Sequence, residues 1–203
     1  GDLQSNGNDI DFADNDKAMF GTGGDLQIYH TGTVSRIQDE GTGGLEITSN
    51  GTGVDINKGL SEYMARFVID GAVELYHNNS KKIETTAQGI NITGNARSSI
   101  TTLTDGANIT VDLSSASHFT VTLGGNRTFV NSGMNTANAI GSSGSIFIVQ
   151  DGTGSRTAAF QSDYKFAGGT APTLSTAANA VDRLDFIVRA ANNVHCVVTL
   201  DVK

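Results

Sequence analysis

GTGGDLQI occupies Gly21–Ile28, and close copies of it, GTGGLEI and GTGVDI, occupy Gly41–Ile47 and Gly51–Ile56. In each copy a glycine turn precedes a segment that alternates apolar and polar residues. Glycine supplies the positive φ that tight turns need, and a two-residue period places alternate side chains on one face of a strand. A chain that repeats this unit builds short β-strands that cannot bury their apolar rows alone. We therefore expect neighbours, here neighbouring chains, to cover these rows.

Composition predicts a folded chain with a thin core. The 203 residues include 49 Leu, Ile, Val and Phe (24%), which exceeds the roughly 20% typical of disordered chains. Hydrophobic residues make up only 37%, with no Trp and 25 Gly, so association is expected to supply part of the stability. No apolar run approaches the roughly 20 residues that span a bilayer, and no signal peptide is visible, so we expect no membrane insertion. Because the first residue is Gly, we expect a fragment or a processed chain.

Charge divides the chain into two parts. Residues 1–94 hold 14 acidic and 6 basic residues, whereas residues 95–203 hold seven of each and no Glu. The two parts suit different surroundings, so we place a domain boundary near Gly94. An acidic first part also disfavours nucleic acid as a partner, because binding phosphates requires basic side chains.

Residues 1–94 are expected to form strands without a helix. The segment 60–69 has a helix-like pattern, but the turn Asp70-Gly71 and the alternation after it favour a hairpin. A single-chain solenoid would show stricter repeats, so one apolar pair per strand at irregular spacing favours a trimer in which three copies of each pair meet on an axis. The pairs are Ile10/Phe12, Leu26/Ile28, Leu45/Ile47, Val54/Ile56, Val73/Leu75 and Ile90/Ile92.

Residues 95–203 change character. Alternating segments at 108–113 and 118–123, an apolar run at 145–150 and a last pair at 184–189 and 194–200 are separated by polar turns. Strands at this spacing predict an antiparallel β-sandwich. The centre of 145–150 is apolar at consecutive positions, which is typical of a strand covered on both faces.

Two long strings in the first part carry a family resemblance. Asp14–His30 (DNDKAMFGTGGDLQIYH) and Gly71–Thr86 (GAVELYHNNSKKIETT) resemble a repeated motif in tail-fibre proteins of tailed bacteriophages, especially marine ones. The run 166–182 is similar to the C-terminal domain of many such fibre proteins. The resemblance implies an all-β fold with a trimeric, intertwined fibre shaft over 1–94 and an antiparallel β-sandwich tip over 95–203.

Metal and phosphate sites have weak sequence support. The glycine turns lack both the dinucleotide pattern and a following helix, so no nucleotide cofactor is expected. A calcium site is a minor alternative to turn formation for four close carboxylates, Asp9, Asp11, Asp14 and Asp16, which do not match the twelve-residue calcium loop. Each resembling string also contains a Tyr-His pair, and in a trimer three copies of His30 or of His77 would meet around one axis, a weak candidate metal or anion site.

Enzyme chemistry is not expected. Glycan hydrolysis needs two carboxylates about 5–10 Å apart, and the available acids either point to opposite faces of a strand or serve turns and ion pairs. These acids are Asp39, Glu40, Asp163, Asp182 and Asp185. The single Cys196 is predicted to be a small buried hydrophobe in a strand.

A binding tip is the more plausible site. Candidate contact residues lie in polar loops after strands: Asn126, Arg127, Asn135, Asn138, Arg156, Tyr164 and Lys165. An exposed Tyr164 ring beside Lys165 would stack on a sugar face, although capping of the sandwich edge is an equal alternative.

The expected function is host recognition by a virion component. The chain would act as a homotrimeric tail fibre that contacts other virion tail proteins and adheres to a glycan or lipopolysaccharide receptor at the bacterial surface. Three weak sites would multiply affinity through effective concentration. Two alternatives remain, a glycan-degrading tailspike-like hydrolase and a purely structural fibre whose second domain is a trimerisation cap.

Overall fold

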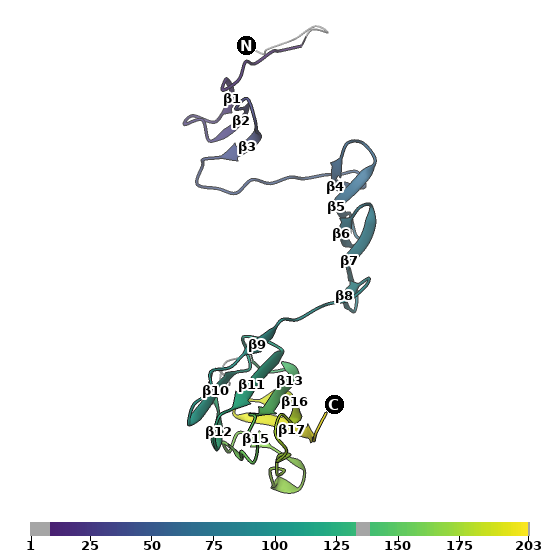
Figure 1. Ribbon diagram of the computed structural model, residues 1–203. Helices are drawn as coiled ribbons and strands as arrows, with labels where there is room; N and C mark the ends of the chain where they lie inside the picture. Colours follow the sequence, from purple (N-terminus) through teal and green to yellow (C-terminus); the bar gives the residue numbers. More distant parts are fainter. Residues whose placement is uncertain (1–8, 133–138, 203) are drawn as a thin grey trace. The chain divides into compact units, whose positions relative to one another are not determined.

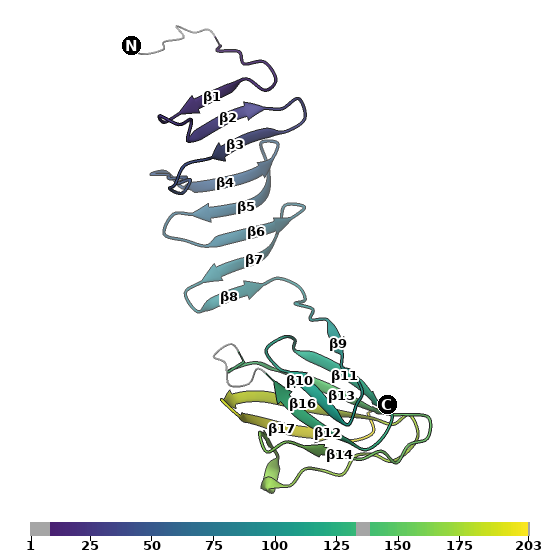
Figure 2. The same ribbon diagram turned by 90° about the vertical axis from the view of Figure 1, so that its left-hand side faces the viewer.

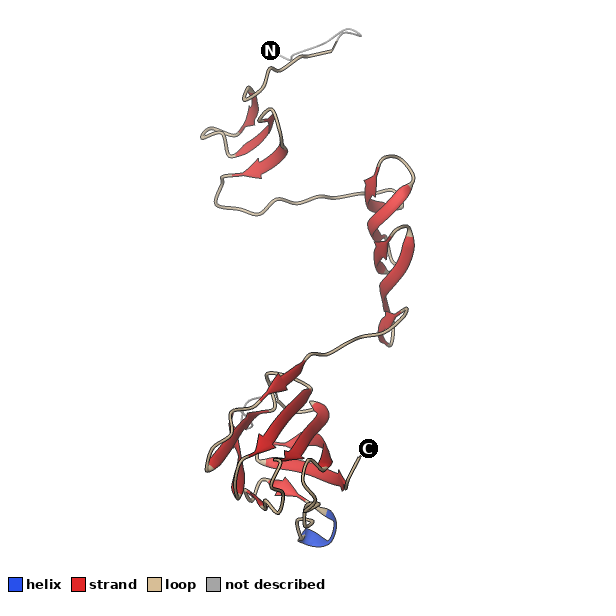
Figure 3. Ribbon diagram, viewed as in Figure 1, coloured by secondary structure: helices blue, strands red, loops and turns tan. Residues whose placement is uncertain are grey.

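The computed structural model describes residues 9–132 and 139–202, and over these residues the chain is almost entirely β, as predicted (Figure 3). The described part contains one short 3-10 helix, Ala167–Gly169, and no helix long and apolar enough to cross a membrane. The chain divides into two compact units, one ending at Asn95 and one starting at Ala96 (Figure 1). The change in charge near Gly94 lies at this division.

The first unit contains two antiparallel sheets (Figure 2). The N-terminal sheet is formed by β1 (Lys17–Phe20), β2 (Leu26–His30) and β3 (Ser35–Asp39). The meander sheet is formed by β4 (Gly53–Lys58), β5 (Glu62–Val68), β6 (Val73–His77), β7 (Ser80–Thr86) and β8 (Gly89–Ile92). The hairpin predicted around Asp70-Gly71 is confirmed, since Asp70 adopts φ 53° between β5 and β6.

The three glycine copies do not all behave as predicted. Gly21 and Gly24 adopt φ of 87° and 72° before β2, and Gly53 begins β4. The strand expected at Gly41–Ile47 is wrong, as is one at Ile10/Phe12, because neither segment forms a strand. Alternation alone does not make a strand, since its backbone needs a neighbouring ladder, and neither segment pairs with a strand of the two sheets.

The second unit packs two sheets face to face. The large sheet has the order β15-β17-β16-β13-β11-β9 and the small sheet the order β10-β12-β14. The strand bounds are β9 (Ile100–Thr102), β10 (Asn108–Asp112), β11 (His118–Leu123), β12 (Arg127–Ser132), β13 (Ser143–Gln150), β14 (Ala158–Phe160), β15 (Tyr164–Lys165), β16 (Val181–Ala190) and β17 (Asn193–Thr199).

The predicted antiparallel pairing is wrong for most of this unit. From β9 to β14 the chain alternates between the two sheets, so strands that follow one another never pair. Each strand from β9 to β12 pairs in parallel with the strand two places further along the chain. The sequence does not reveal this parallel pairing. A turn that crosses to the other sheet has the same types of residue as a turn that joins two neighbouring strands of one sheet. Antiparallel pairing is confined to β13 with β16 and to the terminal hairpin β16–β17.

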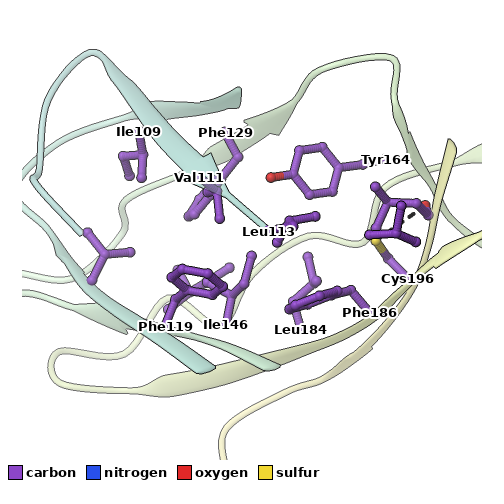
Figure 4. Close-up of a cluster of buried hydrophobic side chains, with 14 of the residues drawn as sticks. Ile109, Val111, Leu113, Phe119, Phe129, Ile146, Tyr164, Leu184, Phe186 and Cys196 are labelled. Atoms are coloured by element: carbon purple, nitrogen blue, oxygen red, sulfur yellow. Dashed lines mark hydrogen bonds between the residues drawn. The ribbon is translucent and has the colours of Figure 1, made fainter. Parts of the chain in front are cut away.

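A single apolar core lies between the two sheets (Figure 4). Phe119, Ile146 and Leu184 occupy neighbouring registers of the large sheet, and Phe129 faces them from the small sheet. Cys196 is buried in this core, as predicted, and burial raises the pKa of its thiol to about 12. The second unit thus has the core that composition alone made doubtful.

Candidate functional site

One face of the meander sheet carries apolar side chains from all five strands. The strand registers place Ile56, Ala65, Leu75, Ile83 and Ile92 in one row across the sheet. A second row on the same face contains Val54, Phe67, Val73 and Ile90. Ala65 is the one buried apolar residue among the described residues of the first unit, while Ile56 and Ile92 remain 50% and 45% exposed. The two rows form an uncovered aliphatic face.

The opposite face of the meander sheet is polar and makes its own interactions. Arg66 Nε lies 3.0 Å from Asp55 Oδ1, and Lys81 Nζ lies 3.1 Å from Glu74 Oε1 and also pairs with Glu84. The hydroxyl of Tyr76 donates a hydrogen bond of 2.7 Å to Glu74, and this bond, reinforced by Lys81, lowers the pKa of the Glu74 carboxyl. These charged groups are paired within one chain, so this face suits solvent.

The N-terminal sheet repeats the same division. On its polar face Lys17 Nζ lies 4.7 Å from the centre of the Tyr29 ring, and Tyr29 donates to Gln38. On its other face Phe20, Ile28 and Ile37 expose 52%, 45% and 61% of their surface. The string Asp14–His30 forms the hairpin β1–β2 and the string Gly71–Thr86 forms the hairpin β6–β7, each with a tyrosine on the polar face and apolar residues on the bare face.

The weak metal candidates are exposed residues at hairpin turns. His30 shares the face of Ile28, as its spacing predicts, and its Nδ1 lies 3.0 Å from Ser35 Oγ. His77 pairs with Ser80 at the corresponding turn of β6–β7. In residues 9–132 and 139–202 no three His, Cys, Asp or Glu side chains gather closely enough to hold a metal ion, and this includes the four acids at 9–16.

Two of the predicted contact residues lie where the turn after β11 enters β12, with Asn126 in the turn and Arg127 as the first residue of β12. Arg127 makes a bidentate ion pair with Asp105, with Nε to Oδ1 2.8 Å and Nη2 to Oδ2 2.6 Å. This pair lowers the pKa of the Asp105 carboxyl. Asn126 accepts a hydrogen bond of 3.0 Å from the amide of Thr157, which joins this turn to the loop between β13 and β14.

Arg156 lies in that neighbouring loop and is also engaged within the chain. Its Nε and Nη2 lie 3.0 and 2.7 Å from Asp151 Oδ2, and this contact lowers the pKa of the Asp151 carboxyl. The buried Gln150 holds the backbone of Arg156 through bonds of 2.8 and 2.9 Å. The structure thus brings Asn126, Arg127 and Arg156 together at one end of the unit, and each already uses part of its side chain in a hydrogen bond within the chain.

Of the two alternatives for Tyr164, the exposed ring is wrong. Its side chain is 5% exposed and lies in the core between the sheets (Figure 4). The ring of Phe160 contacts it edge-on, with 5.5 Å between ring centres. The strand position β15 directs Tyr164 inward and Lys165 outward. Lys165 donates to the carbonyl of Ser162 at 2.6 Å. Asn135 and Asn138 lie outside the described residues.

The candidate carboxylates Asp182 and Asp185 lie in different surroundings. Asp182 is buried and accepts the amides of Ser175 and Asp201 at 2.8 Å each, whereas Asp185 lies on the opposite face of β16 and pairs with Arg183. Ser145 donates to Asp185 at 2.6 Å, and His118 is the register neighbour of Ser145 on β11. A catalytic triad requires the histidine between the other two groups, and here the serine occupies that place.

An open groove of about 560 Å³ lies on the outer surface of the large sheet, at β15, β16 and β17. Its lining is mainly apolar and includes Ile187 and Val197, with Lys165, Asp185 and His195 as its polar members. Sequence reasoning missed this surface. The available signal was an apolar residue, Ile187, at a position of β16 that points outward, because burial alternates residue by residue along this strand.

Comparison with protein-family models, with curated proteins and with solved structures finds no match to this chain. Functional inference therefore rests on the two resembling strings and on the surfaces described above.

Proposed function

We propose that this chain is a component of a bacteriophage tail fibre that assembles as a homotrimer and adheres to the host cell surface. The observation that carries the proposal is the bare aliphatic face on both sheets of the first unit. Seven of the nine apolar side chains on the meander sheet are between 37% and 70% exposed, and a contiguous apolar surface of this kind marks an interaction site. Identical copies are suitable partners, because the charged groups of each copy lie on the opposite face.

Adhesion is assigned to the second unit, whose net charge of zero avoids repulsion from an anionic bacterial envelope. Its exposed polar loops suit carbohydrate hydroxyls, and three copies would raise the affinity of a weak site.

Light scattering on the whole chain tests the assembly. A mass of three times 21.1 kDa is expected, and a particle of 21.1 kDa at micromolar concentration contradicts the fibre proposal. Fluorescently labelled chain should stain host bacteria, and enzymatic removal of surface glycans should abolish the staining.

A purely structural role is the second candidate. It is favoured by the internal engagement of Arg127 and Arg156 and by the burial of Tyr164, which leave fewer free contact groups than a receptor site uses. A trimer that stains no host cells would favour this role over adhesion.

A further inference from the structure

The outer face of the large sheet carries more basic than acidic side chains, among Thr, Ser and apolar residues. Its cationic and imidazole residues are Lys165, Arg183, Arg189, His118 and His195. Asp185 is the only acid that the described strands of this sheet direct outward. It is already engaged, since its Oδ2 lies 3.0 Å from Arg183 and its Oδ1 accepts a hydrogen bond of 2.6 Å from Ser145. The face therefore keeps an excess of positive charge, although the unit as a whole has seven acidic and seven basic residues.

Part of this excess charge lies at the open groove of about 560 Å³ described above. The strand registers align Lys165, His195 and Ile187 in one row across β15, β17 and β16. Since neighbouring strands are about 4.8 Å apart, this row spans about 10 Å. Ile187 is 49% exposed, and Val197, in the next row beside Asp185, is 66% exposed. A mainly apolar groove with a few polar groups, in the range of about 300–1,000 Å³, is typical of a site for a small ligand.

The ammonium group of Lys165 is held beside the groove with its charge uncompensated. Its Nζ donates to the carbonyl of Ser162 at 2.6 Å, and among the described residues neither Lys165 nor Arg189 forms an ion pair. The nearby Asp163 lies in the turn before β15 and does not line the groove. An ammonium group has three donors, and an imidazole has an N–H in either tautomer. Lys165 and His195 can therefore both donate to an anion in the groove.

We infer that this groove binds an acidic saccharide, with its carboxylate between Lys165 and His195 and its ring against Ile187 and Val197. This inference rests on the proposed adhesion, which makes a glycan the class of ligand. A carboxylate accepts hydrogen bonds from both donors, and a bond between two charged groups is stronger than one between neutral groups. The carboxylate has one negative charge, which matches the single charge of Lys165, whereas a phosphate monoester carries about −1.5 to −2 at pH 7.

Calorimetric titration of the whole chain with trigalacturonate tests the site. We expect binding, and the fully methyl-esterified trisaccharide, which keeps the rings without the charges, should bind at least about tenfold more weakly. Lys165→Gln removes the cation from the groove and should weaken the binding of trigalacturonate about tenfold. Arg97→Gln is the control, because it removes a positive charge from the exposed segment before β9, and it should leave the affinity unchanged.

Three results would overturn the inference. Equal binding of the charged and esterified trisaccharides, or no binding of either at millimolar concentration, would exclude the acidic saccharide as the ligand. An unchanged affinity in Lys165→Gln would place the ligand outside the groove. Displacement of trigalacturonate by galactose 6-phosphate but not by galacturonate would assign the site to a phosphate.

Staining of host cells by the same proteins separates this inference from the proposed function. A chain that stains host cells but binds no acidic saccharide overturns the inference and leaves adhesion intact. A chain that binds trigalacturonate through Lys165 but stains no host cells supports the groove as a saccharide site and contradicts the proposed adhesion.

Discussion

Both units are built from short alternating strands, but they treat their apolar side chains in opposite ways. Of the nineteen buried apolar residues in the described chain, eighteen belong to the second unit, and Ala65 alone belongs to the first. The first unit holds nineteen of the twenty-four exposed large hydrophobic residues. The difference arises because the second unit winds between two sheets that cover each other, whereas each sheet of the first unit has a face with no second layer in its own unit. Strand-forming sequence is therefore sufficient for a sheet but not for a core.

The largest expected effect is on assembly. Leu75→Lys places a charge in the middle of the aliphatic row of the meander sheet, where the residue is 42% exposed in the single chain. The isolated chain tolerates an exposed lysine, but an interface between copies would bury it unpaired, so we expect the trimer to be lost in light scattering. Asn91→Lys is the matched control, because it adds the same charge on the polar face beside Glu84. Equal masses for the two variants would contradict the proposal that the apolar face of the meander sheet, and not its polar face, forms the interface between copies.

A large effect on stability is expected from the core of the second unit. Phe129 is fully buried and stacks on Phe160 at 5.2 Å between ring centres. Phe129→Ala should lower the free energy of unfolding by about 3–5 kcal/mol in denaturant titrations followed by circular dichroism. The same truncation at Phe67, which is 46% exposed, should cost much less in unassembled chain and more once copies associate. A similar cost at both positions without assembly would contradict the contrast between the units.

A smaller change in the free energy of unfolding, of opposite sign to that of Phe129→Ala, is expected from a substitution at Tyr164. Its hydroxyl is buried without a hydrogen-bond partner, and burial raises the pKa of this phenol. Tyr164→Phe removes the unpaired group and keeps the ring, so the unfolding free energy should stay unchanged or rise by about 1 kcal/mol. Staining of host cells should also be unchanged. A loss of staining with unchanged stability would return Tyr164 to the receptor site.

The smallest effect is a pH dependence in the second unit. Arg127 lowers the pKa of Asp105 in the folded chain, so the pair stabilises the fold above the unfolded carboxyl pKa of about 3.9 and stops doing so as pH falls through the folded pKa. Because both side chains are partly exposed, Arg127→Gln should lower the free energy of unfolding only slightly at pH 7, and the difference from the wild type should shrink as pH falls through the folded pKa of Asp105. Arg189→Gln removes the same charge from β16 and serves as the control. A difference that persists at low pH would point to lost packing instead of the ion pair.

The sequence predicted the strands well and their partners less well. It located most strands and the Asp70-Gly71 hairpin, because alternation and turn residues are local properties. It failed at Gly41–Ile47, where alternation is present but no strand lies alongside to complete a ladder. It also failed for the parallel winding of the second unit, since the choice between turning within a sheet and crossing to another depends on distant residues.

The candidate site was predicted with less success for the same reason. Asn126, Arg127 and Arg156 do lie together, but only the folded chain reveals that each is already hydrogen-bonded in part, to Thr157, Asp105 and Asp151 respectively. The groove on the large sheet depends on which side of β16 faces the core, and that is decided by packing.

By itself the sequence determined the all-β class and the aliphatic rows of the acidic part, since both follow from residue type and a two-residue period. The tertiary structure alone decided which rows find cover inside the chain. Burial depends on a second layer arriving at the right face, and that layer comes from residues far away in the sequence, as Phe129 does for Phe119 and Ile146. Where the fold provides no such layer within the unit, as along Ile56, Leu75 and Ile92, the apolar side chains remain exposed.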